Sequence, residues 1–292
     1  MIVITGSESF VGKELIKQCI ERGISITGID LVDVKKTDYN YHQIDICDPK
    51  IHEVIPDNAD AIIHLAALSR DVDCKGKGYE CFNVNVMGTL NLMRATRRKN
   101  IKQFIFASSE WVYEKFIGSE EKDENAFIDI SQHKSEYALS KLVSEINLKQ
   151  QFINEFCNVT ILRFGIIYGP RERNWSAVES IAHMVKHNNE ITIGSLKTGR
   201  RFIHVQDVVR GIIMSIGIDG FNIINLTGDK IITLNDIIKI SEKIFNKSIK
   251  INEKNPTDIS LRNPSNKKAK KILNWEPKIE IGEGLKTILP YV

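Results

Sequence analysis

Tyr137 and Lys141 are the residues of this 292-residue chain whose types and spacing point most directly to chemistry. They stand four residues apart in a segment with helical periodicity, so they lie on one face of a helix. A lysine ammonium beside a phenol lowers the phenol's pKa from about 10 towards the range of a general base. Ser109 closes an apolar segment and can share the same substrate hydroxyl. The three residues predict a proton-transfer site.

The beginning of the chain carries a second chemical pattern. Residues 2–5 are apolar, Gly6 opens a turn that ends at Gly12, and residues 13–21 repeat apolar residues at helical spacing, which predicts strand, loop and helix. Gly6 permits a tight turn and Gly12 lets the helix approach the sheet, while N–H groups at the helix start face a pyrophosphate. Asp30 stands where a dinucleotide-binding unit places the acid that binds the ribose 2′-hydroxyl. Because it would repel a 2′-phosphate, NAD is favoured over NADP.

Ser9 departs from this dinucleotide-binding pattern. The three-glycine fingerprint has glycine at this position, where the backbone comes closest to the phosphates. Serine adds a Cβ and a hydroxyl donor, so we expect NAD binding with altered local geometry. The alternative interpretation of residues 2–30 is a buried strand–helix–strand unit that holds no nucleotide.

Alternating elements must position these residues. Apolar runs predict further strands at 43–48, 61–65, 104–107 and 159–162, and periodicity predicts helices at 82–97 and 135–156. Such alternation is typical of a parallel sheet covered on both faces, with ligands beyond the carboxyl ends of the strands. We therefore predict an α/β fold with a Rossmann-type, doubly wound parallel sheet.

Composition narrows the class of partner. The net charge is +3, too small to indicate a nucleic-acid partner. The sequence has neither a secretory leader nor an uncharged apolar run of about 18 residues, so we expect a cytoplasmic protein without a membrane segment. The five cysteines are odd in number and lack Cys-x-x-Cys spacing, which argues against a disulfide framework or a metal site.

Several motifs in order carry a resemblance. They are His64-Leu-Ala-Ala67, Asn85-Val-Met-Gly88-Thr89, Ser108-Ser109-Glu110-Trp111-Val-Tyr113, the Arg200–Asp207 segment and Leu273-Asn-Trp275-Glu-Pro277. Together with the glycine-rich turn and the Tyr137–Lys141 pair, they make the chain resemble the extended short-chain dehydrogenase/reductase family. The resemblance is specifically to its NAD-dependent epimerase/dehydratase group, which acts on nucleotide sugars, and it runs nearly end to end.

The resemblance implies roles for individual residues. NAD would contact Gly6, Ser9, Phe10, Val11, Gly12, Asp30, Leu31, Asp45, Ile46, Leu65, Ala66, Ala67, Asn85, Ser108, Tyr137, Lys141 and Phe164. A nucleotide-diphosphate sugar would contact Ser69, Ser109, Trp111, Arg171, Arg200 and Arg262. Among the arginines, Arg200 is the preferred diphosphate ligand, because a guanidinium binds phosphate through two parallel hydrogen bonds. Arg171 and Arg262 are equally well explained as ordinary surface arginines.

The implied mechanism begins with oxidation of the sugar, usually at C4. Tyr137 removes the hydroxyl proton while hydride passes to NAD, Lys141 holds Tyr137 anionic, and Ser109 orients the hydroxyl. Return of hydride to the opposite face gives an epimer, and the chain fits a sugar 4-epimerase best. A 4,6-dehydratase with Glu110 as its acid and a C4 dehydrogenase or ketoreductase stay open, although Trp111 supplies no second acid or base. Alternatives of another class are a catalytically silent NAD-binding module and a structural subunit.

The resemblance also implies the domain organisation and assembly. An NAD-binding domain would span residues 1–168, with residues 202–226 returning to it, and a smaller mixed α/β nucleotide-sugar-binding domain would span residues 169–292. A homodimer would form through the helix that carries Tyr137 and the helix that follows Ala67. The apolar side chains expected at this contact are Phe82, Val86, Leu90, Leu142, Ile146 and Phe152. His64 is expected to be structural rather than a base.

Overall fold

The computed structural model describes residues 1–292 and divides into two compact units. The first comprises Met1–Glu114, Phe127–Arg163 and Val209–Ile224, and the second comprises Lys115–Ala126, Phe164–Val208 and Asn225–Val292. In this division the first long boundary falls at residue 163 rather than 168, and the returning segment is 209–224 rather than 202–226. Nothing in the sequence analysis indicated that residues 115–126 leave the first unit.

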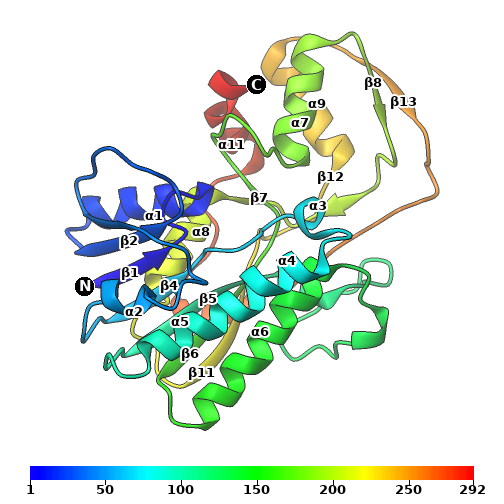
Figure 1. Ribbon diagram of the computed structural model, residues 1–292. Coiled ribbons are helices and arrows are strands. Elements are labelled where there is room, and N and C mark those ends of the chain that lie inside the picture. The colour runs from blue at the N-terminus through cyan, green and yellow to red at the C-terminus, as the bar shows by residue number, and fades with distance from the viewer. The chain divides into compact units, whose positions relative to one another are not determined.

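A seven-stranded sheet forms the centre of the first unit (Figure 1), in the order β11-β6-β5-β4-β1-β2-β3. The strands are β1 (Ile2–Thr5), β2 (Ile26–Asp30), β3 (Asn40–Gln43), β4 (Ala61–His64), β5 (Gln103–Ser109), β6 (Asn158–Phe164) and β11 (Phe221–Leu226). From β5 through β4, β1 and β2 to β3 every pairing is parallel. The predicted α/β parallel sheet is confirmed, and the strand order reverses beside β1, where such sheets bind ligands.

The third strand lies earlier than the apolar run at 43–48 predicted. It ends at Gln43, and the residues after it form a turn because Asp45 accepts a hydrogen bond from the N–H of Cys47 at 2.8 Å. An aspartate that bonds the backbone two residues ahead favours a turn over a strand. Asp45 and Ile46 therefore lie beyond the strand end.

Helices flank the sheet of the first unit. They are α1 (Phe10–Glu21), α2 (Ile51–Val54), α3 (Asp71–Cys74), α4 (Gly78–Phe82), α5 (Thr89–Thr96), α6 (Glu136–Ile153) and α8 (Val205–Met214), with short 3₁₀ helices at Glu110–Tyr113 and Ile130–Gln132. The single helix expected at 82–97 starts at Gly78 and contains a π-helical segment, Asn83–Gly88, between α4 and α5. The buried core joins strand residues such as Val3, Ile62 and Phe104 to Leu92 and Leu148 of α5 and α6.

The second unit is built from short strand pairs and helices. Its strands are β7 (Ile167–Tyr168), β8 (Glu190–Ile193), β9 (Gly199–Arg200), β10 (Ile203–His204), β12 (Ile232–Thr233) and β13 (Lys250–Glu253), paired as β10-β7, β12-β9 and β13-β8. Its helices are α7 (Ala177–His187), α9 (Leu234–Phe245), α10 (Lys267–Leu273) and α11 (Ile281–Thr287), with a 3₁₀ turn at Leu289–Tyr291. Thr233 and Asp236, three residues apart in the sequence, form a capping box at the start of α9.

No helix of the protein combines the length and apolarity that a bilayer crossing requires. The structure also brings together no group of three or more His, Cys, Asp or Glu side chains suited to a metal ion.

Candidate active site

The glycine-rich turn after β1 is packed so closely that two of its positions exclude a side chain. Gly6 has a positive φ of 72°, and a Cβ on it would lie 2.7 Å from the backbone N of Ala66. A Cβ on Gly12 would lie 2.2 Å from the carbonyl oxygen of Gly6. Gly6 therefore lets the chain turn beside the end of β4, and Gly12 lets α1 rest on that turn.

Ser9 fits this turn without distortion. Its backbone is extended, with φ −69° and ψ 168°, so the conformation does not require glycine. Its side-chain oxygen accepts a hydrogen bond from the N–H of Gly12 at 3.1 Å and caps α1, ahead of Phe10 and Val11. We expected the Ser9 hydroxyl to act as a donor to the cofactor. In this structure it accepts a hydrogen bond within the turn, which leaves its proton for a further acceptor.

Asp30 is held at the carboxyl end of β2. One carboxylate oxygen accepts the N–H of Glu8 at 2.8 Å, and the other accepts the N–H of Leu31 at 2.7 Å. The first contact ties the acid to the glycine-rich turn. The oxygen bonded to Leu31 also accepts the N–H of Val32 at 3.3 Å, so the oxygen bonded to Glu8 is the one with a lone pair left for a further donor. Leu31 itself is largely exposed. The arrangement suits a carboxylate that accepts hydrogen bonds from ribose hydroxyls.

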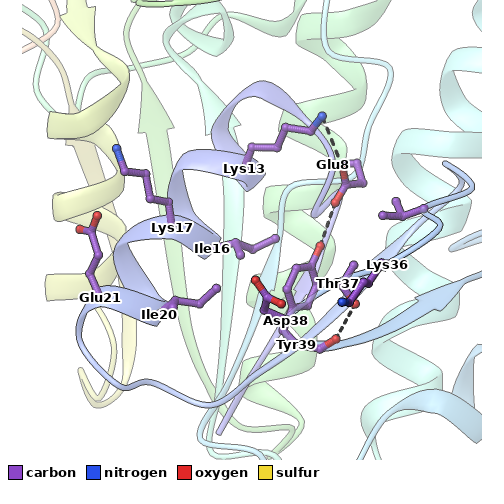
Figure 2. A pocket seen from close by; sticks show the side chains of 11 residues that line it. Glu8, Lys13, Ile16, Lys17, Ile20, Glu21, Lys36, Thr37, Asp38 and Tyr39 are labelled. Carbon is purple, nitrogen blue, oxygen red and sulfur yellow. Dashed lines mark hydrogen bonds and ion pairs between the residues drawn. The ribbon is translucent and has the colours of Figure 1, made fainter.

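A cavity of about 500 Å³, which the motifs did not predict, opens between α1 and the segment that joins β2 to β3. Figure 2 shows Glu8 between Lys13 and Tyr39: the Tyr39 hydroxyl donates to its carboxylate at 2.8 Å, and Lys13 lies 3.4 Å away. The ring of Tyr39 covers Gly28, where a Cβ would lie 2.5 Å from it. None of the predicted catalytic residues lines this cavity, so we place the reaction elsewhere.

The wall beyond β4 is formed by Leu65, Ala66 and Ala67 and is fixed by Asn85. The Asn85 side chain accepts the N–H of Leu68 at 2.8 Å, donates to the carbonyl of Leu68 at 3.0 Å, and also donates to Ser140. It lies in the π-helical segment Asn83–Gly88, and such segments often occur at functional sites. Because its amide is fully engaged with the protein, we propose that Asn85 shapes the cofactor wall through Leu68.

The turn at Asp45 and Ile46 is also fixed by the helix behind it. Asn91 donates to the carbonyl oxygens of Ile46 and Asp48 at 2.8 and 2.9 Å. Ile46 is buried against Gly88, where a Cβ would lie 2.7 Å from its side chain. The Ile46 side chain is therefore part of the core, so only its backbone can contact a ligand at this turn.

His64 is a buried structural residue, as expected. One ring nitrogen lies 2.7 Å from the Thr5 hydroxyl and the other 2.9 Å from the Thr89 hydroxyl. Burial and the nearby charge of Lys141 lower the pKa of His64 to about 3. The neutral ring thus bridges β1 and the helix that contains Thr89.

Acid should weaken the fold through His64. The unfolded ring has a pKa of about 6.5, so stability is complete above that pH and falls as the pH drops towards 3, because only the unfolded chain binds the proton. We expect the free energy of unfolding to fall by about 2 kcal/mol between pH 6.5 and pH 5 from this residue. Urea unfolding of His64→Gln should show a lower stability at pH 7 and a flatter acid limb. A control, His52→Gln at an exposed position, should keep the wild-type slope.

Ser109, Tyr137 and Lys141 are brought together at the end of β5. All three are buried, at 7%, 8% and 3% exposure. The Ser109 side chain lies close enough to Tyr137 to lower its pKa, and it caps the 3₁₀ turn by accepting the N–H of Trp111 at 3.2 Å. Lys141 donates to the carbonyl oxygen of Ala107 at 2.8 Å. The predicted neighbours are therefore assembled on one helix face opposite the strand end.

The expectation that Lys141 lowers the pKa of Tyr137 is wrong for this structure. Burial raises the pKa of Tyr137 to about 12, and only the Ser109 hydrogen bond opposes the rise. Burial also lowers the pKa of Lys141 to about 8. The ammonium is instead bonded to the Ala107 carbonyl and lies 4.8 Å from the centre of the Phe106 ring, and Lys141 is not among the groups that shift the Tyr137 pKa.

An unpredicted pair of cysteines surrounds Tyr137. Cys74 of α3 and Cys81 of α4 are fully buried and pack with Tyr137, and Leu68 and Trp111 cover the same cluster. Burial and a hydrogen bond with Cys81 raise the pKa of Cys74 to about 12, so it is a neutral thiol. The cluster explains the high pKa of the phenol, and it places Trp111 against the predicted base.

Glu110 and Ser108 flank Ser109 and are both buried. Glu110 starts the 3₁₀ turn Glu110–Tyr113, so its carboxyl group follows the serine directly in the chain. Ser108 faces a buried carboxylate, Glu145, rather than an open cofactor site, since its hydroxyl donates to Glu145 at 2.5 Å.

The predicted substrate-binding residues differ in the contacts that they make within the protein. Arg171 donates from Nε to the buried carboxylate of Glu179 at 2.8 Å, so it holds the start of α7 and is not an ordinary surface residue. Arg200 donates to the carbonyl oxygens of Gly199 and Ser260 at 2.8 and 2.6 Å. Arg262 lies 5.4 Å from the centre of the Phe116 ring. Arg171, Arg200 and Arg262 all belong to the second unit. So does the buried Phe164, whereas the exposed Ser69 belongs to the first.

Arg201 is a buried cation of the second unit that the sequence analysis passed over. Its Nε donates to the Asn263 side chain at 2.6 Å, and a terminal nitrogen lies 3.5 Å from Glu121. Glu121 belongs to residues 115–126, so this contact helps to fix that segment in the second unit.

Comparison with known proteins agrees with this geometry. A UDP-glucuronate 4-epimerase of Thermodesulfobacterium geofontis is 28% identical over 306 residues, covering 97% of this chain and 93% of the relative. UDP-glucuronic acid decarboxylase 1 of Arabidopsis thaliana is 27% identical, covering 97% of this chain and 68% of that protein.

The fold has solved counterparts and the sequence matches a family model. The UDP-glucose 4-epimerase of Thermotoga maritima superposes with a TM-score of 0.86 at 24% identity, covering 99% of this chain and 97% of that one. The UDP-glucuronic acid 4-epimerase of Bacillus cereus superposes with a TM-score of 0.85 at 24% identity, covering 99% of this chain and 98% of that one. Residues 2–225 match the model of the NAD dependent epimerase/dehydratase family. The glycine-rich turn, the buried Ser109–Tyr137–Lys141 group and this match together show that the chain belongs to the NAD dependent epimerase/dehydratase family.

Proposed function

We propose that the protein is an NAD-dependent 4-epimerase of a nucleotide-diphosphate sugar. The observation that carries the proposal is the buried group of Ser109 at the end of β5 with Tyr137 and Lys141 of α6, which stand one helical turn apart. Within an NAD-dependent family, a phenol paired with a serine hydroxyl is suited to exchange a proton with a substrate alcohol.

The residues around the turn after β1 fit the cofactor. Gly6 and Gly12 leave no space for side chains, and the fixed carboxylate of Asp30 can accept hydrogen bonds from ribose hydroxyls. NAD, when bound, supplies the acceptor of the C4 hydride and later its donor. Its positive charge also favours the phenolate form of Tyr137 over the phenol.

The protein residues perform the proton chemistry. Tyr137 takes the proton of the C4 hydroxyl, and Ser109 orients that hydroxyl and stabilises the carbonyl oxygen that forms. Lys141 adds its positive charge to that of NAD in the pocket where the phenolate forms. When hydride returns to the opposite face of the sugar, Tyr137 gives the proton back and the C4 configuration is inverted.

Epimerisation is favoured over elimination by Trp111. Its indole packs in the Tyr137 cluster and has no acid or base to offer, so only Glu110 could serve a dehydration. The buried position of Glu110 beside Ser109 keeps a 4,6-dehydratase as the second candidate. Among relatives, the names UDP-glucuronate 4-epimerase and UDP-glucuronic acid decarboxylase favour a uridine nucleotide and a uronic acid as first trials.

Incubation with NAD and a panel of UDP-, GDP-, CDP- and dTDP-sugars, UDP-glucuronate included, tests the proposal. A product of unchanged mass with inverted C4 in its NMR spectrum is expected. Loss of one water would instead show dehydration and give Glu110 the role of acid, and loss of carbon dioxide would show decarboxylation. Loss of two hydrogens with stoichiometric NADH would show net oxidation. NAD binding without any turnover would favour the silent binding module.

The proposal includes a homodimer formed through α6 and the helix that spans α4 to α5. These helices contact one another within the first unit and expose Tyr79, Met87, Ile146 and Ile153. Val86 and Leu142, two of the expected contact residues, are instead buried inside the protomer. Light scattering at micromolar concentration should give twice the monomer mass, and Ile146→Glu should reduce it.

A further inference from the structure

A buried ion pair lies behind the catalytic residues and has no part in the proposed chemistry. Arg163 of β6 donates from Nε and a terminal nitrogen to the two carboxylate oxygens of Glu145, at 3.0 and 2.6 Å. The two side chains are only 3% and 4% exposed. The guanidinium also stacks 4.8 Å from the Tyr113 ring. Isolated buried pairs seldom add net stability, so a role for this one must be sought in what it touches.

Glu145 is the last of three residues of α6 that bind three consecutive residues of β5. Lys141 donates to the carbonyl of Ala107 at 2.8 Å, and Ser108 donates to Glu145 at 2.5 Å. Ser109 lies next to Tyr137 and lowers its pKa. The strand end that carries Ser109 is therefore fixed to the helix that carries the base.

Glu145 also adds a negative charge near Lys141. Glu145 follows Lys141 by four residues on the same helix face. Burial lowers the pKa of Lys141 to about 8, and Cys81, Cys74 and Glu145, in this order, oppose the fall. His64 of β4, which also lies nearby, is a neutral ring. Glu145 is thus the carboxylate that favours a protonated Lys141.

We propose that Glu145 is a positioning residue of the active site. Paired with Arg163, it fixes the end of β5 through Ser108 and supplies the negative charge that keeps Lys141 protonated. The proposal rests on the proposed function in one respect, namely that Lys141 must be a cation when Tyr137 takes a proton. Arg163 holds the carboxylate in place, since a bidentate guanidinium binds it more firmly than a single donor would.

The first test needs no sugar substrate. The ¹³Cε resonance of Lys141, assigned with Lys141→Arg, is titrated by NMR in the NAD-loaded protein. In Glu145→Gln the midpoint should fall by at least about one pH unit, because an attractive charge is lost and Arg163 is left unpaired. The matched control Glu53→Gln, which removes one negative charge at an exposed position, should leave it unchanged. An unshifted midpoint in Glu145→Gln overturns the proposal, whatever the sugar panel shows.

The second test separates the two tasks of Glu145. Ser108→Ala removes its contact with β5 and keeps the ion pair, so kcat should fall about tenfold through misplacement of Ser109 while the Lys141 midpoint stays constant. Glu145→Asp keeps the negative charge but shortens the side chain, so kcat should again fall about tenfold while the Lys141 midpoint stays constant. This variant also tests the positioning role if Glu145→Gln fails to fold. A midpoint that moves as far in Ser108→Ala as in Glu145→Gln would overturn the electrostatic part. Full activity in both Ser108→Ala and Glu145→Asp would overturn the positioning part.

Discussion

Replacing Tyr137 with phenylalanine is expected to lower kcat/KM by about a thousandfold, because the change removes the group that exchanges the proton. The substitution deletes one oxygen from a ring that is 8% exposed and packed against Cys74, Cys81 and Trp111. The ring should therefore stay in place. NAD affinity, measured by calorimetry, should change by less than about threefold, and the thermal midpoint should be nearly constant.

The control for Tyr137→Phe is Tyr79→Phe, the same chemical change on an exposed tyrosine of α4. It should keep wild-type turnover. If Tyr137→Phe retained more than about a tenth of the activity, general base catalysis by this phenol would be contradicted. If Tyr137→Phe lost NAD binding instead, the main role of Tyr137 would be to bind the cofactor, and the result would favour the catalytically silent NAD-binding module.

Replacing Gly12 with alanine is expected to cause the second large loss. The added Cβ would lie 2.2 Å from the Gly6 carbonyl oxygen and 2.6 Å from that of Ser7, and both are backbone atoms that cannot turn aside. The turn and the start of α1 must then separate. We expect the free energy of unfolding to fall by about 2 kcal/mol and NAD binding to weaken at least tenfold, which is about 1.4 kcal/mol.

Gly78→Ala provides the matched control for Gly12→Ala. At Gly78, the first residue of α4, an added Cβ meets nothing closer than Glu136 Cγ at 3.8 Å. Stability should be unchanged or higher, since alanine is favoured over glycine in a helix. Wild-type NAD affinity in Gly12→Ala, measured by calorimetry, would contradict the close packing described for the turn.

The parts of the fold that the sequence predicts are those that local rules determine. Gly6 and Gly12 are recognisable because only a turn packed against a strand end requires glycine at both positions. Thr233 is recognisable because its spacing to Asp236 specifies a cap. The parallel sheet follows from the alternation of apolar strands and amphipathic helices. Each of these signals is complete within about twenty residues of sequence.

The features that the sequence did not predict depend on contacts between distant residues. The π-helical segment around Asn85 uses residue types that suit an ordinary helix, and only its contact with Leu68 marks it. The burial of Tyr137 by two cysteines, which reverses the expected direction of its pKa, is decided by the packing of α3 and α4 on α6. The same holds for Glu145, whose partner Arg163 lies on β6.

Ser9 shows how a departure from a motif can mislead. The fingerprint suggests that serine here weakens a phosphate-binding turn. The structure gives it an extended backbone and a capping bond to Gly12, both of which suit serine. The conformation at position 9 therefore does not itself require glycine.

The fate of the hydrogen on C4 tests the central claim most directly. The sugar nucleotide that turns over in the panel would be prepared with deuterium at C4 and incubated with the protein and NAD in ordinary water, and the product would be followed by NMR. We predict a C4-inverted product that keeps its deuterium, because the hydrogen leaves and returns without exchanging with solvent. Inverted product that carries hydrogen from water at C4 would contradict the account, since inversion would then proceed without hydride transfer at that carbon.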